Sequence, residues 1–146
     1  MKCSFLIVFV ALVVITDAQS RVTLPKGVTH VSFGTAHRYF GPGKESCVVV
    51  YPVPGAVFER GITELTYAVE LEAKIVKQAS ATVMGASAQP LRSVPCNVFT
   101  PIPGGFSQTQ IGSTISRADK GPLSSGQYTL RIVVDGQTAD VPFTIK

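Results

Sequence analysis

The chain has 146 residues, 45% of them hydrophobic, and its 13 Lys and Arg against 9 Asp and Glu give a formal net charge of +4. The basic residues stand singly with no run of three, whereas nucleic-acid binding needs a clustered basic stripe with aromatics. We therefore expect no nucleic-acid partner. The mildly basic surface either is simply solvated or favours anionic partners such as lipid headgroups.

An apolar segment stands at the amino end. Lys2 precedes an apolar run at residues 5–15, which is too short to span a bilayer. Thr16 and Ala18 place small residues at the −3 and −1 positions of a cleavage site. We interpret residues 1–18 as a secretory signal peptide and residues 19–146 as one mature, secreted, extracellular domain. No second apolar run approaches transmembrane length, so we expect no transmembrane segment.

Removal of the signal peptide would also remove Cys3 and leave Cys47 and Cys96. Two cysteines in an oxidising compartment most simply form one disulfide bond. Such a bond would stabilise the fold by about 4 kcal/mol in the chain-entropy model. Two buried free thiols are the alternative. In either case the apolar core must provide most of the stability.

Along the chain, short β-branched runs at residues 28–33 and 47–53 predict the first strands. Residues 64–85 are rich in Glu, Lys, Ala and Leu, which is a composition typical of a helix. From Leu65 to Ile75, however, every odd position is apolar, which is the period of a strand. We therefore predict a strand over residues 65–75, a polar turn near residues 76–78, and a second strand after the turn.

The carboxyl-terminal third has the clearest strand pattern. Residues 108–116, 128–134 and 139–145 predict three more strands. Asp135-Gly136 between the last two is a strong hairpin signal, because a type I′ turn needs positive φ at both central residues. Pro142 cannot donate to a ladder, so the last strand should be an edge strand or contain a bulge.

Seven or eight short strands, separated by Pro-Gly turn signals and with no convincing helix, predict the fold class. We expect a single-domain, all-β protein, an antiparallel immunoglobulin-like β-sandwich.

No group of residues in the sequence demands catalysis. His30 and His37 have no carboxylate within several residues, and zinc sites usually need three or four ligands. The GPGK motif at residues 41–44 lacks the spacing of a phosphate loop and has a proline where an amide is needed. No serine lies in G-x-S-x-G. We expect no enzyme, no cofactor and no bound metal.

The phenylalanines are the positive signal. Several lie near expected loops rather than in the middle of strands: Phe40, Phe58, Phe99 and Phe106. They either plug the ends of a solid core or form the mouth of an apolar cavity between the sheets, which would suit a hydrophobic ligand.

The order of features resembles the ML lipid-recognition family over about residues 58–145. Arg60-Gly61 precedes the long alternating strand, PIPGG follows Cys96-Asn97, and VVDGQ forms the last hairpin. The family typically carries three disulfide bonds, and here only Cys96 matches; a Cys47–Cys96 bridge would be a different cross-link. The chain is either a diverged member or an unrelated sandwich with generic β patterning.

The resemblance implies a small apolar ligand, a lipid or sterol, held between two sheets without catalysis. The residues expected to line this site are Val69, Leu71, Ile75, Phe99, Phe106, Leu130, Ile132, Val141 and Phe143. The alternative function is a solid-core immunoglobulin-like recognition or structural protein that has an extracellular protein partner and no small ligand. Periodicity does not separate core residues from lining residues.

Overall fold

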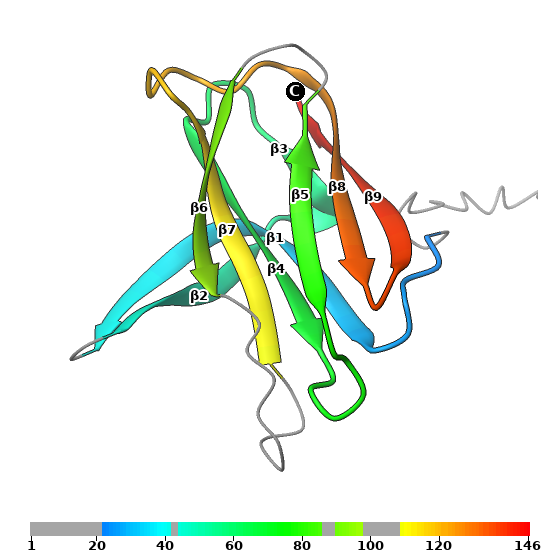
Figure 1. The fold of residues 1–146 in the computed structure, drawn as a ribbon. Helices are drawn as coiled ribbons and strands as arrows, with labels where there is room; N and C mark the ends of the chain where they lie inside the picture. Colours follow the sequence, from blue (N-terminus) through cyan, green and yellow to red (C-terminus); the bar gives the residue numbers. More distant parts are fainter. Residues whose placement is uncertain (1–21, 42–43, 86–89, 98–108) are drawn as a thin grey trace, which may run out of the picture.

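Two β-sheets pack face to face in the computed structural model (Figure 1). The structure describes residues 22–41, 44–85, 90–97 and 109–146, with the backbone alone at 36–41, 44–49, 96–97 and 109. The described part contains no α-helix. The predicted all-β sandwich is therefore confirmed.

Sheet A has five strands in the order β2 (Lys44–Pro52), β1 (Val28–Gly41), β4 (Glu64–Leu71), β7 (Thr109–Arg117) and β6 (Leu91–Asn97). Sheet B has four strands in the order β3 (Val57–Phe58), β9 (Gln137–Ile145), β8 (Gly126–Val134) and β5 (Ala79–Met84). A single 3-10 turn, Pro54–Ala56, precedes β3. All described strand pairs are antiparallel except β3 with β9.

Residues 64–85 form strands and not a helix, as the alternation predicts. The predicted end of the first strand is wrong, however, because β4 ends at Leu71 and not at Ile75. Residues 72–78 make a turn in which the amides of Ile75 and Val76 both donate to the Glu72 carbonyl. This turn crosses between the sheets, so β4 and β5 lie in different sheets and are not paired with each other.

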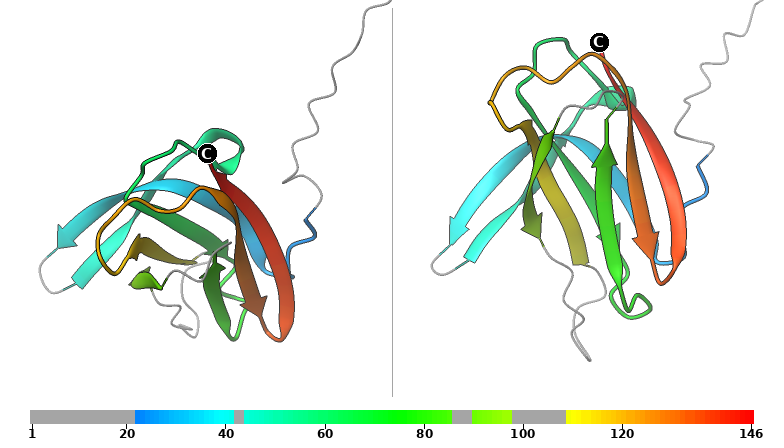
Figure 2. Two further views of the ribbon diagram at one scale, coloured as in Figure 1. Left: turned by 90° about the horizontal axis from the view of Figure 1, so that it is seen from above. Right: turned by 45° about the horizontal axis from the view of Figure 1, so that its top comes forward.

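Both faces of β4 are buried. Leu65, Tyr67, Val69 and Leu71 point toward sheet B, and Thr66 and Ala68 on the opposite face are each only 1% exposed. The edge strands β2 and β6 approach each other, so sheet A curls over its own outer face (Figure 2). Both faces of this central strand are therefore covered by protein, one by sheet B and the other by the curl of sheet A.

The missing side chain of Gly34 permits a close approach of β1 and β2. Gly34 is paired both with Pro52 on β2 and with Thr66 on β4, so it marks the point where β1 changes partners. A Cβ atom at this position would lie 1.8 Å from the Tyr51 carbonyl oxygen. Only glycine permits so close an approach of β2 to β1.

The predicted carboxyl-terminal hairpin is confirmed. Asp135 and Gly136 have φ values of 47° and 81° between β8 and β9. Pro142 pairs with Thr129 without a register shift. Because β9 pairs with β3 only at Thr144 and Ile145, Pro142 lies where β9 is an edge strand. Its missing amide therefore costs the sheet no hydrogen bond.

The Asp135 carboxylate joins this hairpin to the turn at residues 72–78. It accepts hydrogen bonds from the amides of Lys77 at 3.1 Å and Gln78 at 2.8 Å, and the Asp135 amide donates to the Gln78 carbonyl at 3.0 Å. One side chain thus fixes the place where the chain enters sheet B.

We expect Asp135→Ala to lower the free energy of unfolding by about 2–3 kcal/mol, because hydrogen bonds to a charged group are lost and alanine disfavours positive φ. Asp135→Asn should lose about 1 kcal/mol, because asparagine retains an acceptor oxygen and tolerates positive φ. Urea denaturation at neutral pH measures both variants. Equal stability of Asp135→Ala and the unmodified protein would contradict this role.

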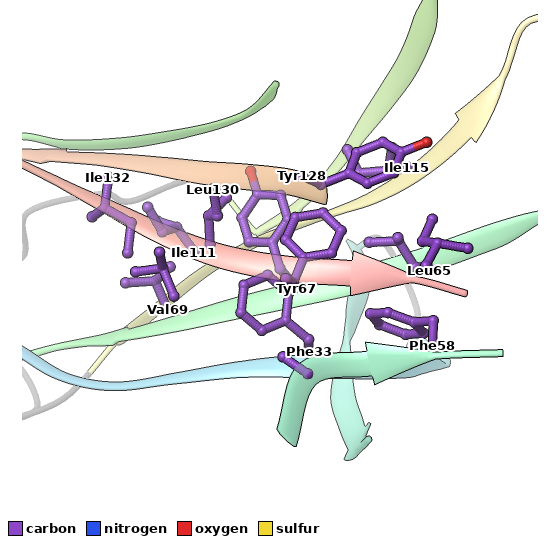
Figure 3. Packing of buried hydrophobic residues seen from close by; sticks show 14 of the residues in the cluster. Phe33, Phe58, Leu65, Tyr67, Val69, Ile111, Ile115, Tyr128, Leu130 and Ile132 are labelled. Atoms are coloured by element: carbon purple, nitrogen blue, oxygen red, sulfur yellow. The ribbon is translucent and has the colours of Figure 1, made fainter. Parts of the chain in front are cut away.

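The core lies between the two sheets. Figure 3 shows the rings of Phe33, Tyr67 and Tyr128 in this space. The ring centroid of Phe143 lies 4.8 Å from that of Phe33 and 5.2 Å from that of Tyr128. Phe33 belongs to sheet A, whereas Tyr128 and Phe143 belong to sheet B, so aromatic side chains of the two sheets are in direct contact.

Candidate functional site

Six of the residues predicted to line a ligand site lie in the packed core. Each is at most 4% exposed and belongs to one continuous cluster of buried apolar side chains: Val69, Leu71, Leu130, Ile132, Val141 and Phe143. They come from β4, β8 and β9 and face the space between the sheets. In this structure their neighbours there are other protein side chains.

The other predicted lining residues are placed differently. Ile75 is 42% exposed, and its predicted inward position is wrong because β4 has already ended at Leu71. Phe99 and Phe106 lie outside the described residues. The side chains of Cys47 and Cys96 also lie outside the described part, so the disulfide bond between them stays a prediction.

A polar contact also joins the sheets across the core. The Tyr67 hydroxyl on β4 donates to the Ala81 carbonyl on β5 at 2.9 Å, and Ser113 Oγ on β7 lies 3.3 Å from the same hydroxyl. Burial raises the pKa of Tyr67 above its ordinary value, so this hydroxyl keeps its proton and remains a donor. The buried polar group is satisfied within the fold.

A hollow lies on the outer face of sheet A. We call it the β6–β7 groove; its volume is about 450 Å³, and its lining residues are Thr63, Glu64, Arg92, Val94, Thr114, Ser116, Arg117 and Lys120. Its floor is formed by outward-facing, even-numbered residues of β4, β6 and β7. Its volume is within the range of small-ligand sites in proteins.

The strand register places opposite charges on the two sides of this groove. Ser116 on β7 pairs with Arg92 on β6 and with Glu64 on β4, so the three residues form one row across the sheet. Neighbouring strands lie about 4.8 Å apart, so Arg92 and Glu64 are separated by about 10 Å at the backbone. No ion pair or hydrogen bond joins these two side chains in the part of the chain that the structure describes.

Arg117 is already neutralised. Its guanidinium forms an ion pair with Asp119 and donates to the Pro122 carbonyl at 3.3 Å. The Gly121 amide donates to Asp119 at 3.0 Å, and this hydrogen bond, followed by the one from Arg117, lowers the pKa of the Asp119 carboxyl. Asp119 therefore stays ionised beside Arg117 at neutral pH.

Arg92 and Lys120 are the groove cations available for binding. Both are exposed, and neither side chain has an ion-pair or hydrogen-bond partner among the residues that the structure describes. They lie far apart in the sequence, on β6 and in the loop after β7. The sequence showed only single, scattered positive charges, and the β6–β7 register that brings these residues together had no local signal.

The described residues form no metal centre. They contain no group of three or more His, Cys, Asp and Glu side chains that could hold a metal ion. A smaller hollow of about 160 Å³ lies where the amino-terminal segment meets β1 and β9, and its lining includes Leu24, His30 and Val141. Within the same ranges, no helix has the length and apolar character needed to cross a membrane.

No protein-family model matches the chain, and no curated protein is similar to it at a significant level.

Proposed function

We propose that this protein is a secreted, non-enzymatic binding protein that holds an anionic ligand in the β6–β7 groove. The observation that carries the proposal is a pair of cations at a hollow large enough for a small ligand: the side chains of Arg92 and Lys120 have no partner within the described part of the chain. The packed sandwich serves as the scaffold that holds the three strands of the groove in register. Secretion rests on the signal-peptide pattern of residues 1–18.

This proposal departs from a lipid or sterol site between the sheets. Such a ligand would have to separate the rings of Phe33, Tyr128 and Phe143, which are already in contact. It would also have to break the hydrogen bond from Tyr67 to β5. Filled interiors have few voids larger than a water molecule. The outer groove therefore accounts for binding with less rearrangement of the protein.

Charge would supply much of the attraction. Two uncompensated cations in one concave surface raise the local concentration of anions and accelerate their association. Screening by salt weakens such exposed contacts, so we expect binding to fall as the salt concentration rises. A specific groove must still be distinguished from the general effect of a net charge of +4.

The test compares two double variants of equal charge on a phosphocellulose column eluted with a salt gradient. Arg92→Glu with Lys120→Glu reverses the groove, and Lys26→Glu with Lys74→Glu reverses two exposed lysines outside it. We expect the groove variant to elute at clearly lower salt than the control variant. Elution of both variants at the same salt concentration would refute the groove as the preferred anion site.

A further inference from the structure

The β6–β7 groove has two chemically different sides. The cations Arg92 and Lys120 belong to β6 and the loop after β7, and the carboxylate of Glu64 belongs to β4 on the far side of Ser116. A site for a simple anion such as phosphate gains nothing from a carboxylate, because like charges repel. The presence of Glu64 indicates a ligand that has hydrogen-bond donors as well as an anionic group.

Hydroxyl groups line the space between these charges. Thr63, Thr114 and Ser116 contribute side-chain hydroxyls, each of which can both donate and accept. Thr114 Oγ1 lies 3.1 Å from Thr66 Oγ1, which orients it within the floor of the groove. Val94 is the main apolar surface and is 38% exposed. Walls of this kind suit a ligand that is itself rich in hydroxyls.

The same walls exclude other ligand classes. An acyl chain would leave the Thr63 and Ser116 hydroxyls and the ionised groups without hydrogen bonds to the ligand or to water, which carries a desolvation penalty. A ligand that offers only anionic groups would place negative charge against Glu64. A sugar ring with a carboxylate or sulfate fits both sides, because its oxyanion can face the cations while its hydroxyls donate to Glu64.

Resting on the proposed function, we infer that the β6–β7 groove binds an acidic saccharide. Arg92 and Lys120 contact the oxyanion, Glu64 accepts hydrogen bonds from ring hydroxyls, and Thr63 and Ser116 contact the remaining hydroxyls. A volume of about 450 Å³ accommodates one or two sugar rings, so the groove binds the end or a short portion of a glycan. Free sugar acids and glycan-attached residues share this chemistry.

Isothermal titration calorimetry with a defined probe tests the inference. The probe is a hyaluronan tetrasaccharide, which alternates glucuronate with N-acetylglucosamine; chitotetraose is its neutral counterpart, and free glucuronate distinguishes a monosaccharide site from a glycan site. We expect the tetrasaccharide to bind, and chitotetraose to bind about tenfold more weakly or worse. The Arg92→Gln variant should bind the tetrasaccharide about tenfold more weakly than the unmodified protein does.

The decisive variant is Glu64→Ala. Acceptance of sugar hydroxyls by Glu64 predicts tetrasaccharide binding about tenfold weaker in this variant, whereas a site for anions alone predicts tighter binding once the negative charge is removed. Glu59→Ala is the matched control, because it removes an exposed carboxylate outside the groove and should leave binding unchanged.

The outcomes separate the inference from the proposal beneath it. Tighter binding in Glu64→Ala, with inorganic phosphate competing against the probe, would overturn the saccharide and leave the anion groove intact. Phosphocellulose elution of the groove and control double variants at the same salt, together with no binding of the tetrasaccharide, would overturn both. Weaker binding in Glu64→Ala, with Glu59→Ala unchanged and circular dichroism spectra alike, supports the saccharide.

Discussion

Gly34→Ala should lower the free energy of unfolding by about 4 kcal/mol or more, or prevent folding altogether. The added Cβ would lie 1.8 Å from the Tyr51 carbonyl oxygen and 2.6 Å from the Tyr51 carbonyl carbon. Both atoms belong to the backbone, so no side-chain rotation can relieve the clash. The end of β2 must move away from β1, and the outer face of sheet A must open with it. Thermal and urea denaturation measure the loss.

Gly136→Ala is the matched control for this prediction. Gly136 has a φ of 81°, and a Cβ there would meet no heavy atom within 4 Å. Alanine should therefore cost only the backbone strain of positive φ, about 1–2 kcal/mol. If the two alanine variants were equally stable, steric exclusion at the β1–β2 contact would be the wrong explanation for Gly34.

Phe143→Ala should lower the free energy of unfolding by about 3–5 kcal/mol. Its ring lies against Phe33, Tyr128 and Phe58 at centroid distances of 4.8, 5.2 and 6.2 Å and is 2% exposed. Removing it leaves a cavity and deletes contacts on both sheets. Urea denaturation of the purified protein, with no ligand added, is the measurement.

Ile75→Ala supplies the comparison for Phe143, because both residues were expected to line one ligand site. Ile75 is 42% exposed in the turn after β4, so its truncation should cost less than about 1 kcal/mol. A residue that lines a ligand cavity has fewer protein neighbours than one in a packed core. If Phe143→Ala changed the free energy of unfolding of the ligand-free protein only slightly, that result would favour a binding cavity between the sheets.

Local patterns in the sequence determine much of this fold. The alternation from Leu65 onward and the Asp135-Gly136 turn were readable because strand period and positive φ are properties of a few neighbouring residues. The end of β4 at Leu71 could not be predicted, because Ala73 and Ile75 continue the same alternating pattern into a turn. The partners of each strand were not readable either, because alternation does not state which sheet a strand joins.

The groove depends on pairing between distant segments. Arg92, Ser116 and Glu64 form one row only because β6 and β4 flank β7 in a particular register. Each residue alone has the appearance of an ordinary solvated side chain. The residues predicted to line an interior site could be recognised as inward-facing but not assigned a role. An inward apolar position has the same sequence pattern whether its side chain fills a core or lines a cavity.

The pairing of β3 with β9 has a consequence for biosynthesis. Sheet B needs β9 between β3 and β8, and the Lys146 amide donates to the Phe58 carbonyl at 3.0 Å. At the other end, the Lys26 amide donates to the Gln137 side chain at 3.1 Å. A nascent chain therefore exposes part of the apolar face of sheet A until β9 has been synthesised. Sheet B cannot be completed before that point, because β3 is joined to the rest of the sheet only through β9.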